Sequence, residues 1–288
     1  MKQPTKEVIR LRFDKLEKSL MRTVVSFDSE DIHVFRVEIK KLRAFLRLCG
    51  KSRAGKPKLP KALHVFYRVT GGIRNLQMQQ QRVRETWKNK VESMPRTYLS
   101  LLSLDAADAM LSAKRFARKN MHVSRDKRSL LANIPDHISK KSIRHFALAT
   151  LSGLEALPGT FGHFTDAIIH STRKLLKDLQ YNLPYEKMEM AFPLPHLPAD
   201  GEAGIESLTD TLGEFQDICS SVALLQPCYL QRIPDEAERA VLRGWKAEIE
   251  IEKEQWREKI GDLLAQHVVE PTSGQLCVAR NGMITYAR

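Results

Sequence analysis

Apolar residues recur at helical spacing along most of the chain. The first group predicts an amphipathic helix over residues 5–23, through Ile9, Phe13, Leu16 and Leu20. Similar patterns predict further helices over about 29–50, 61–91, 104–121, 136–157, 164–183, 203–226 and 235–267. The alternation typical of strands is absent from the sequence through residue 270. The pattern therefore predicts an all-α protein.

Glycine and proline residues mark where these helices stop. Residues 51–60 read KSRAGKPKLP and predict a basic loop, and residues 122–134 are expected to form a connector. The helix over 164–183 is expected to end before Pro184, because proline lacks the N–H that a helix interior uses. Three more prolines follow, so residues 184–201 are expected to form a long loop.

The C-terminal tail, residues 271–288, differs from the helical body at 1–270. Asn281 and Gly282 stand between two short apolar runs, which is typical of a β-hairpin turn. A lone hairpin is only marginally stable in water. The tail is therefore expected to dock on the body or on another chain.

An internal repeat relates two of the predicted helices. Residues 33–46 read HVFRVEIKKLRAFL, and residues 170–183 read HSTRKLLKDLQYNL. Both stretches carry a histidine, an arginine and a lysine in the same order: His33, Arg36 and Lys40 in the first, His170, Arg173 and Lys177 in the second. Downstream, GGIRNL at 71–76 resembles GEFQDI at 213–218. The chain therefore looks duplicated.

This repeat predicts two pseudo-symmetric four-helix bundles, over about 1–122 and about 136–270. A cationic helix in each half, turned toward the other half, would create a basic cavity between them. The second copy is less cationic, because Asp178 stands where the first copy has Lys41.

Four cations in the first copy recur at steps of four, three and four, and we call them the cationic stripe: Arg36, Lys40, Arg43 and Arg47. On a helical wheel they lie within roughly 60° of one another. Apolar residues flank them on both sides, which predicts that the stripe lines a groove. Stacked like charges repel, and a polyanion would neutralise them. Neighbouring cations are about 5 to 6 Å apart along the helix, a spacing that suits a string of phosphates.

Composition supports a polyanionic partner. The 288 residues include 47 Lys and Arg against 34 Asp and Glu, a formal charge of +13. Four cysteines without CxxC spacing indicate a reducing compartment. No apolar signal segment and no apolar run of roughly 18 residues are present, so we expect a cytoplasmic protein without a membrane span.

The motif H-x-x-R-V-x-x-K-K-L-R at 33–43 and its weaker copy at 170–179 resemble the CHAD domain family, the conserved histidine α-helical domain. The resemblance covers nearly the whole chain, to about residue 270. It implies two pseudo-symmetric four-helix bundles, a central basic cavity and binding of long-chain inorganic polyphosphate. It also implies a possible association with polyphosphate granules, which some members show.

Carried over position by position, the resemblance implies these anion contacts: His33, Arg36, Lys40, Arg43, His170, Arg173 and Lys177. Arg74 is a weaker candidate, because its counterpart is Gln216. Arg47 comes from the helical wheel alone, and Pro184 occupies its place in the other copy.

Two rival functions stay open. Charge also suits a nucleic-acid-binding protein, but aromatic residues are only 7% of the chain and none lies in the cationic stripe to stack bases. A polyphosphate-processing enzyme needs a general base or a metal site, and none is visible. EIEIEKE at 248–254 differs from the ExExK signature of tunnel-fold triphosphatases, because Glu252 stands where a basic residue belongs. No third ligand joins His33 and His170, so we expect a non-catalytic protein without metal or cofactor.

Overall fold

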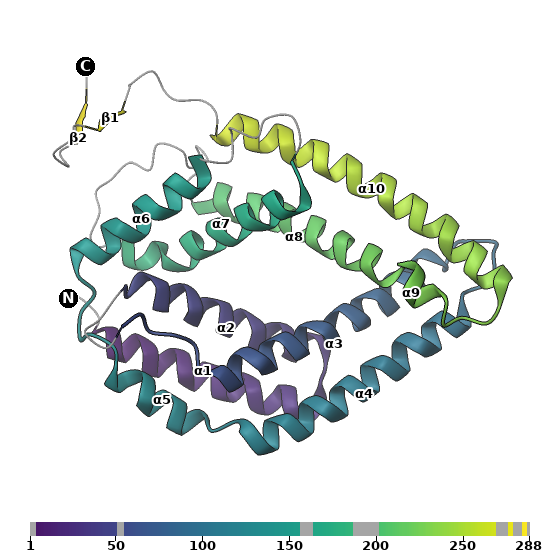
Figure 1. Cartoon of the computed structure of the whole chain (residues 1–288), viewed down its shortest axis with the longest axis horizontal. Coiled ribbons are helices and arrows are strands. Elements are labelled where there is room, and N and C mark those ends of the chain that lie inside the picture. The colour runs from purple at the N-terminus through teal and green to yellow at the C-terminus, as the bar shows by residue number, and fades with distance from the viewer. Residues whose placement is uncertain are drawn as a thin grey trace.

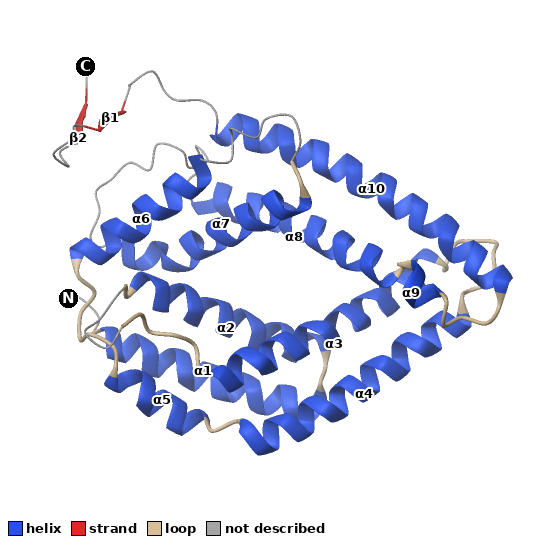
Figure 2. Cartoon of the chain, in the orientation of Figure 1, coloured by secondary structure: helices blue, strands red, loops and turns tan. Residues whose placement is uncertain are grey.

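The structure is a computed structural model that describes residues 4–50, 55–155, 164–186, 202–268, 276–278 and 284–286. Within these residues the body is entirely helical, which confirms the all-α prediction (Figures 1 and 2). The helices are α1 (Thr5–Ser26), α2 (Ser29–Leu48), α3 (Lys61–Thr86), α4 (Arg96–Asn120), α5 (Val123–Ala132), α6 (Lys140–Glu155), α7 (Asp166–Glu186), α8 (Glu202–Leu224), α9 (Pro227–Leu230) and α10 (Glu236–Val268).

The helices form two groups that meet at both ends of the molecule. Helices α1–α5 lie on one side and α6–α10 on the other (Figure 1). At one end α2 packs against α6 and α7, and at the other α3 packs against α8. The first junction includes a buried hydrogen bond, which Nδ2 of Asn182 in α7 donates to the carbonyl oxygen of Ala44 in α2 at 3.0 Å. Two pockets lie between the groups, one lined by α2, α3 and α7 and one lined by α3, α8 and α10, and we call the space that they form the cleft.

Three large apolar clusters hold this arrangement together. One joins α1, α2 and α5 to parts of α3, α4 and α6, around Phe13, Phe35 and Phe45. A second joins α7, α8 and α10. The third crosses between the groups, because Trp87 of α3's C-terminal end packs with Trp245 of α10. The third cluster fixes the far end of the cleft.

Two local predictions were wrong. Residues 122–134 contain the helix α5 instead of a connector alone, because Val123 and Leu130 are buried and α5 packs against α1. Helix α7 continues through Pro184 to Glu186. A proline in the last turn removes only one helical hydrogen bond, so the helix can continue for two residues beyond it.

Two further boundaries differ: the predicted helix over 104–121 begins earlier, at Arg96, and the predicted helix over 61–91 ends earlier, at Thr86. The start of α2 agrees with the sequence. Asp28 caps α2, since its side chain accepts a hydrogen bond from the Glu30 N–H at 2.8 Å. In the tail, β1 (Leu276–Val278) and β2 (Ile284–Tyr286) pair antiparallel. The predicted turn residues, Asn281 and Gly282, lie outside the described residues, so the docked hairpin stays a prediction. No described helix has the length and apolar character to cross a membrane.

Candidate functional site

Helix α2 buries both flanks of the cationic stripe. Phe35, Ile39 and Leu42 on one flank have no exposed surface, and neither do Ala44 and Leu48 on the other. Because both flanks are packed against other helices, the cationic side chains between them lie in a depression between α2 and its neighbours. The helical wheel predicts such a groove.

Helices α2 and α7 face each other across a pocket of about 320 Å³. Its lining comes from α2, α3 and α7, namely Lys40, Arg43, Arg47, Tyr67, His170, Arg173, Lys174, Lys177, Asp178 and Tyr181. Six of these residues are lysine or arginine and one is a carboxylate, so the pocket is strongly positive. Six of the nine predicted anion contacts thus meet here: Lys40, Arg43, Arg47, His170, Arg173 and Lys177.

Arg36 lies beside this pocket, held against α3. Its guanidinium stacks over the ring of Tyr67 at 4.2 Å, and its Nη1 donates a hydrogen bond to the Tyr67 carbonyl oxygen. Arg43 lies over the same ring at 5.8 Å. Burial lowers the pKa of Arg36, and Arg74 lowers it further. Arg36 therefore carries a largely desolvated charge in a fixed position.

A glycine on the following helix makes room for the arginine in each half. A Cβ at position 71 of α3 would clash with Nη1 of Arg36. A Cβ at position 213 of α8 would lie 3.2 Å from Nη2 of Arg173, closer than most side-chain contacts. The matched pairs, Arg36 on Gly71 and Arg173 on Gly213, support the predicted repeat, which itself stays a prediction.

Lys40 occupies the centre of the positive charge. Burial, and after it the charges of neighbouring cations led by Arg173, together lower the pKa of Lys40 to about 8. Lys177 also contributes. Because Arg173 and Lys177 belong to α7, the cations of α7 lie close enough to α2 to repel Lys40. An anion between the two helices would relieve this repulsion.

The chain matches the CHAD domain family over residues 7–226. It belongs to the CHAD domain family. The crystal structure of the CHAD domain from the plant Ricinus communis superposes with a TM-score of 0.68, covering 90% of this chain and 89% of that chain at 16% identity. At this identity the similarity shows the fold alone. No curated protein matched the chain.

The three remaining predicted contacts of this CHAD domain, His33, Arg36 and Arg74, do not line the pocket. Arg74 donates hydrogen bonds from Nη1 to the carbonyl oxygen and the Oγ of Ser29, at 2.7 and 3.0 Å, and lines a neighbouring pocket. Partial burial lowers the pKa of His33, and Arg74 lowers it further. Of these residues, Arg36 touches the pocket lining through Tyr67.

Two carboxylates enter the basic region of the CHAD domain. Asp178 of α7 pairs with Arg47 of α2, and burial raises the pKa of Asp178 although Arg47 opposes that shift. Asp210 of α8 pairs with Lys177 at 3.3 Å. Arg47 and Lys177 are thus partly neutralised within the protein. Lys40 and Arg43, in contrast, make no ion pair within the described residues.

The sequence did not reveal three lining residues: Tyr67, Lys174 and Tyr181. Lys174 follows Arg173 directly, and that adjacency could have identified it. Tyr181 follows Lys177 by four residues on the same face of α7, so helical spacing could have identified it as well. Tyr67 could not be found, because it enters from α3. The two tyrosines bring aromatic rings to the pocket from outside the cationic stripe, although Arg36 already covers the Tyr67 ring.

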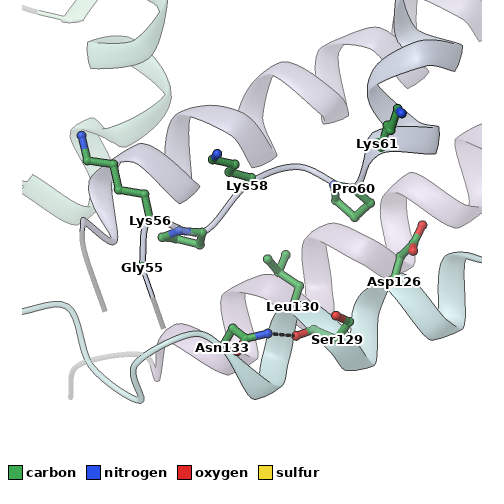
Figure 3. Close-up of a pocket in the computed structure, with 10 residues that line it drawn as sticks. Gly55, Lys56, Lys58, Pro60, Lys61, Asp126, Ser129, Leu130 and Asn133 are labelled. Atoms are coloured by element: carbon green, nitrogen blue, oxygen red, sulfur yellow. Dashed lines mark hydrogen bonds between the residues drawn. The ribbon is translucent and has the colours of Figure 1, made fainter. Parts of the chain in front are cut away.

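A separate basic region of the CHAD domain surrounds the loop before α3. A pocket of about 390 Å³ lies between this loop and α5 (Figure 3). The ammonium ends of Lys56, Lys58 and Lys61 point away from Asp126 and Asn133 across the pocket. These three lysines are exposed, so this loop presents its charge to solvent instead of to an enclosed site.

His170 has a polar neighbour from α8. Its Nδ1 lies 2.8 Å from Oε1 of Gln216, so the ring is oriented by an amide. Among the described residues, no group of three or more His, Cys, Asp or Glu side chains is arranged to hold a metal ion.

Proposed function

We propose that this CHAD domain binds inorganic polyphosphate, without catalysis, in the pocket between α2 and α7. The observation that supports this most is the meeting of two cationic rows from distant parts of the sequence on one pocket. The family is linked to polyphosphate binding.

The chemistry of the pocket suits a chain of phosphates. Arginine forks donate paired hydrogen bonds to phosphate oxygens, and lysine adds a compact point charge. Arg43 and Arg173 supply such forks from opposite helices, and Lys40 lines the same pocket. Bound phosphates would also remove the mutual repulsion that depresses the pKa of Lys40.

The same observations favour a binding protein over an enzyme. The pocket is lined by one carboxylate, Asp178, and Arg47 already pairs with it. A general base needs a free acceptor within reach of the reacting atoms. Phosphate release from long-chain polyphosphate by the purified protein, with divalent metal added, would contradict this part of the proposal.

Nucleic acid is the second candidate ligand, because Tyr67 and Tyr181 place two aromatic rings in the pocket. A stacking site needs an open ring face. Arg36 covers the ring of Tyr67 at 4.2 Å, which favours polyphosphate. We further propose that the protein meets its ligand in the cytoplasm, including at polyphosphate granules, and co-localisation imaging would test this.

Calorimetric titration tests the main proposal. Long-chain polyphosphate is compared with duplex DNA at equal phosphate concentration and fixed salt, because both ligands release counterions. Polyphosphate should bind the protein far more tightly than DNA does. Lys40→Ala/Lys177→Ala should weaken polyphosphate binding, whereas Lys56→Ala/Lys58→Ala, which removes the same charge from the exposed loop, should leave it nearly unchanged. Equal effects of the two variants would contradict the site.

A further inference from the structure

The net charge of the residues that line the cleft changes from positive to negative along its length. Next to the basic pocket, a second pocket of about 330 Å³ opens between α3, α8 and α10. Its charged lining residues are two arginines, Arg74 and Arg82, and four acids, Glu85, Glu214, Asp217 and Glu252. We call this the acidic pocket. Two pockets of nearly equal size therefore carry opposite net charge.

Contacts between α7 and α8 show that the two pockets follow one another. Along α7 from Lys177 through Arg173 to His170, the partners on α8 advance from Asp210 through Gly213 to Gln216. The α8 residue after Gln216 already lines the acidic pocket. Arg74 also lines it, while its charge reaches Lys40 in the basic pocket.

Helix α8 carries its acids in a row along this path. Asp210, Glu214 and Asp217 are spaced four and three residues apart, on one helical face, and all three are exposed. Asp210 pairs with Lys177, but Glu214 and Asp217 form no ion pair within the described residues. Their negative charge is therefore available to act on a ligand in the cleft.

Direct contacts also close the cleft beyond these acids. Ser221 Oγ on α8 donates a hydrogen bond to Gln79 Oε1 on α3 at 2.6 Å, between two buried side chains. Gln79 Nε2 in turn donates to the Tyr98 hydroxyl at 3.0 Å. Arg82 on α3 pairs with Glu252 on α10. A polymer that moved past Asp217 would meet a packed junction.

We propose that Glu214 and Asp217 end the path of the bound polyanion, so that a linear phosphate chain occupies the basic pocket and leaves on the same side. This inference rests on the proposed function. Phosphates that approached the two carboxylates would be repelled in a partly enclosed space, where charges interact more strongly than in bulk water. The bound segment is therefore short, and the rest of a long chain stays outside.

The test removes the two charges and varies the length of the ligand. Glu214→Gln/Asp217→Asn should tighten binding of long-chain polyphosphate about fivefold to tenfold. Tripolyphosphate, which fits within the basic pocket, should bind this variant about as it binds the unaltered protein. The control, Glu92→Gln/Asp108→Asn, neutralises two exposed acids that line neither pocket and should change neither affinity.

Three outcomes separate the possibilities. If the long-chain affinity changes no more than in the control, or if tripolyphosphate gains equally, the acids do not end the path. If the unaltered protein binds no polyphosphate, the proposed function itself fails. Both replaced residues are exposed, so the variants should fold, and thermal melts verify this. Glu214→Lys alone provides a second variant, which should likewise bind long-chain polyphosphate more tightly while its affinity for tripolyphosphate changes little.

Discussion

Helices α2 and α7 occupy equivalent places in the two halves, yet they use their cations differently. In each, an arginine lies against a glycine of the next helix, Arg36 against Gly71 and Arg173 against Gly213. On α2, Lys40 and Arg43 have no acidic partner within the described residues. On α7, Lys177 pairs with Asp210. Arg173 and Lys174 of α7 likewise form no ion pair within the described residues. The arginine position is thus common to both halves, and the halves differ in where a carboxylate enters: Asp178 pairs with Arg47 of α2, and Asp210 pairs with Lys177 of α7.

The difference shows how one helix pair can serve both binding and assembly. Asp178 of α7 takes the Arg47 end of the cationic stripe and joins the two halves. A carboxylate at this position reduces the charge offered to a ligand and fastens α2 to α7. We infer that both helices offer unpaired cations to a ligand, and that the pair of Arg47 with Asp178 also fastens α2 to α7.

The largest predicted effect is on polyphosphate affinity, and it compares the cations of α2 with those of α7. Lys40→Ala/Arg43→Ala should weaken polyphosphate binding by about 100-fold, because two unpaired cations are lost. Lys174→Ala/Lys177→Ala should weaken it by only about tenfold, since Asp210 already neutralises part of that row. Titration calorimetry at one salt concentration measures both. Equal losses would show that the halves contribute equally.

The glycine positions give the next largest contrast. Gly71→Ala would displace Arg36 from its contact with Tyr67 and should cost about 1–3 kcal/mol of stability. Gly213→Ala meets Arg173 at 3.2 Å, where a small shift is enough, so its cost should stay below about 1 kcal/mol. Thermal unfolding compares the two variants. A larger loss of stability for Gly213→Ala than for Gly71→Ala would contradict this prediction.

A smaller effect is expected when the acid on α7 is removed. Asp178→Asn frees Arg47 and should tighten polyphosphate binding about threefold. The Arg47 side chain is 38% exposed, so the lost pair should lower stability by no more than about 1 kcal/mol. Titration and thermal melts check the two expectations. Weaker binding would mean that Asp178 positions Arg47 for the ligand.

A further prediction concerns the pH dependence of stability. The pKa of Lys40 is about 8 in the folded protein, below its ordinary value of about 10.5 in the unfolded chain. Between these values the unfolded state binds more protons, so Lys40 should make stability rise with pH from about 8 to 10.5. Lys40→Met should remove this rise and stabilise the ligand-free protein near pH 7. Melting temperatures across this range provide the measurement.

Much of the fold was readable because helical periodicity is a local property. The buried flanks of α2 and the Asp28 cap follow from residue spacing alone. Helix α5 was missed, since only Val123 and Leu130 mark its buried face in a short polar segment. The apolar cluster that includes Trp87 and Trp245 could not be foreseen, because it depends on how the two halves meet.

The candidate site was predicted where charge repeats within a helix, and missed where it depends on a neighbour. The wheel identified the cationic stripe, and the repeat identified its counterpart on α7. Tyr67 enters from α3, and its role depends on the stacking of Arg36, which no spacing in the sequence encodes. The partnership of Asp178 with Arg47 likewise joins residues that are far apart in the chain.

The buried hydrogen bond from Asn182 to Ala44 has a consequence for how a complex would form. To swing apart at this junction, the two halves would have to break that bond and leave polar groups without partners. This bond therefore opposes opening of the cleft at this end, and we expect a phosphate chain, whose links rotate freely, to adapt its shape to the protein. Most of the conformational entropy lost on binding would then be lost by the ligand, because the protein changes shape little.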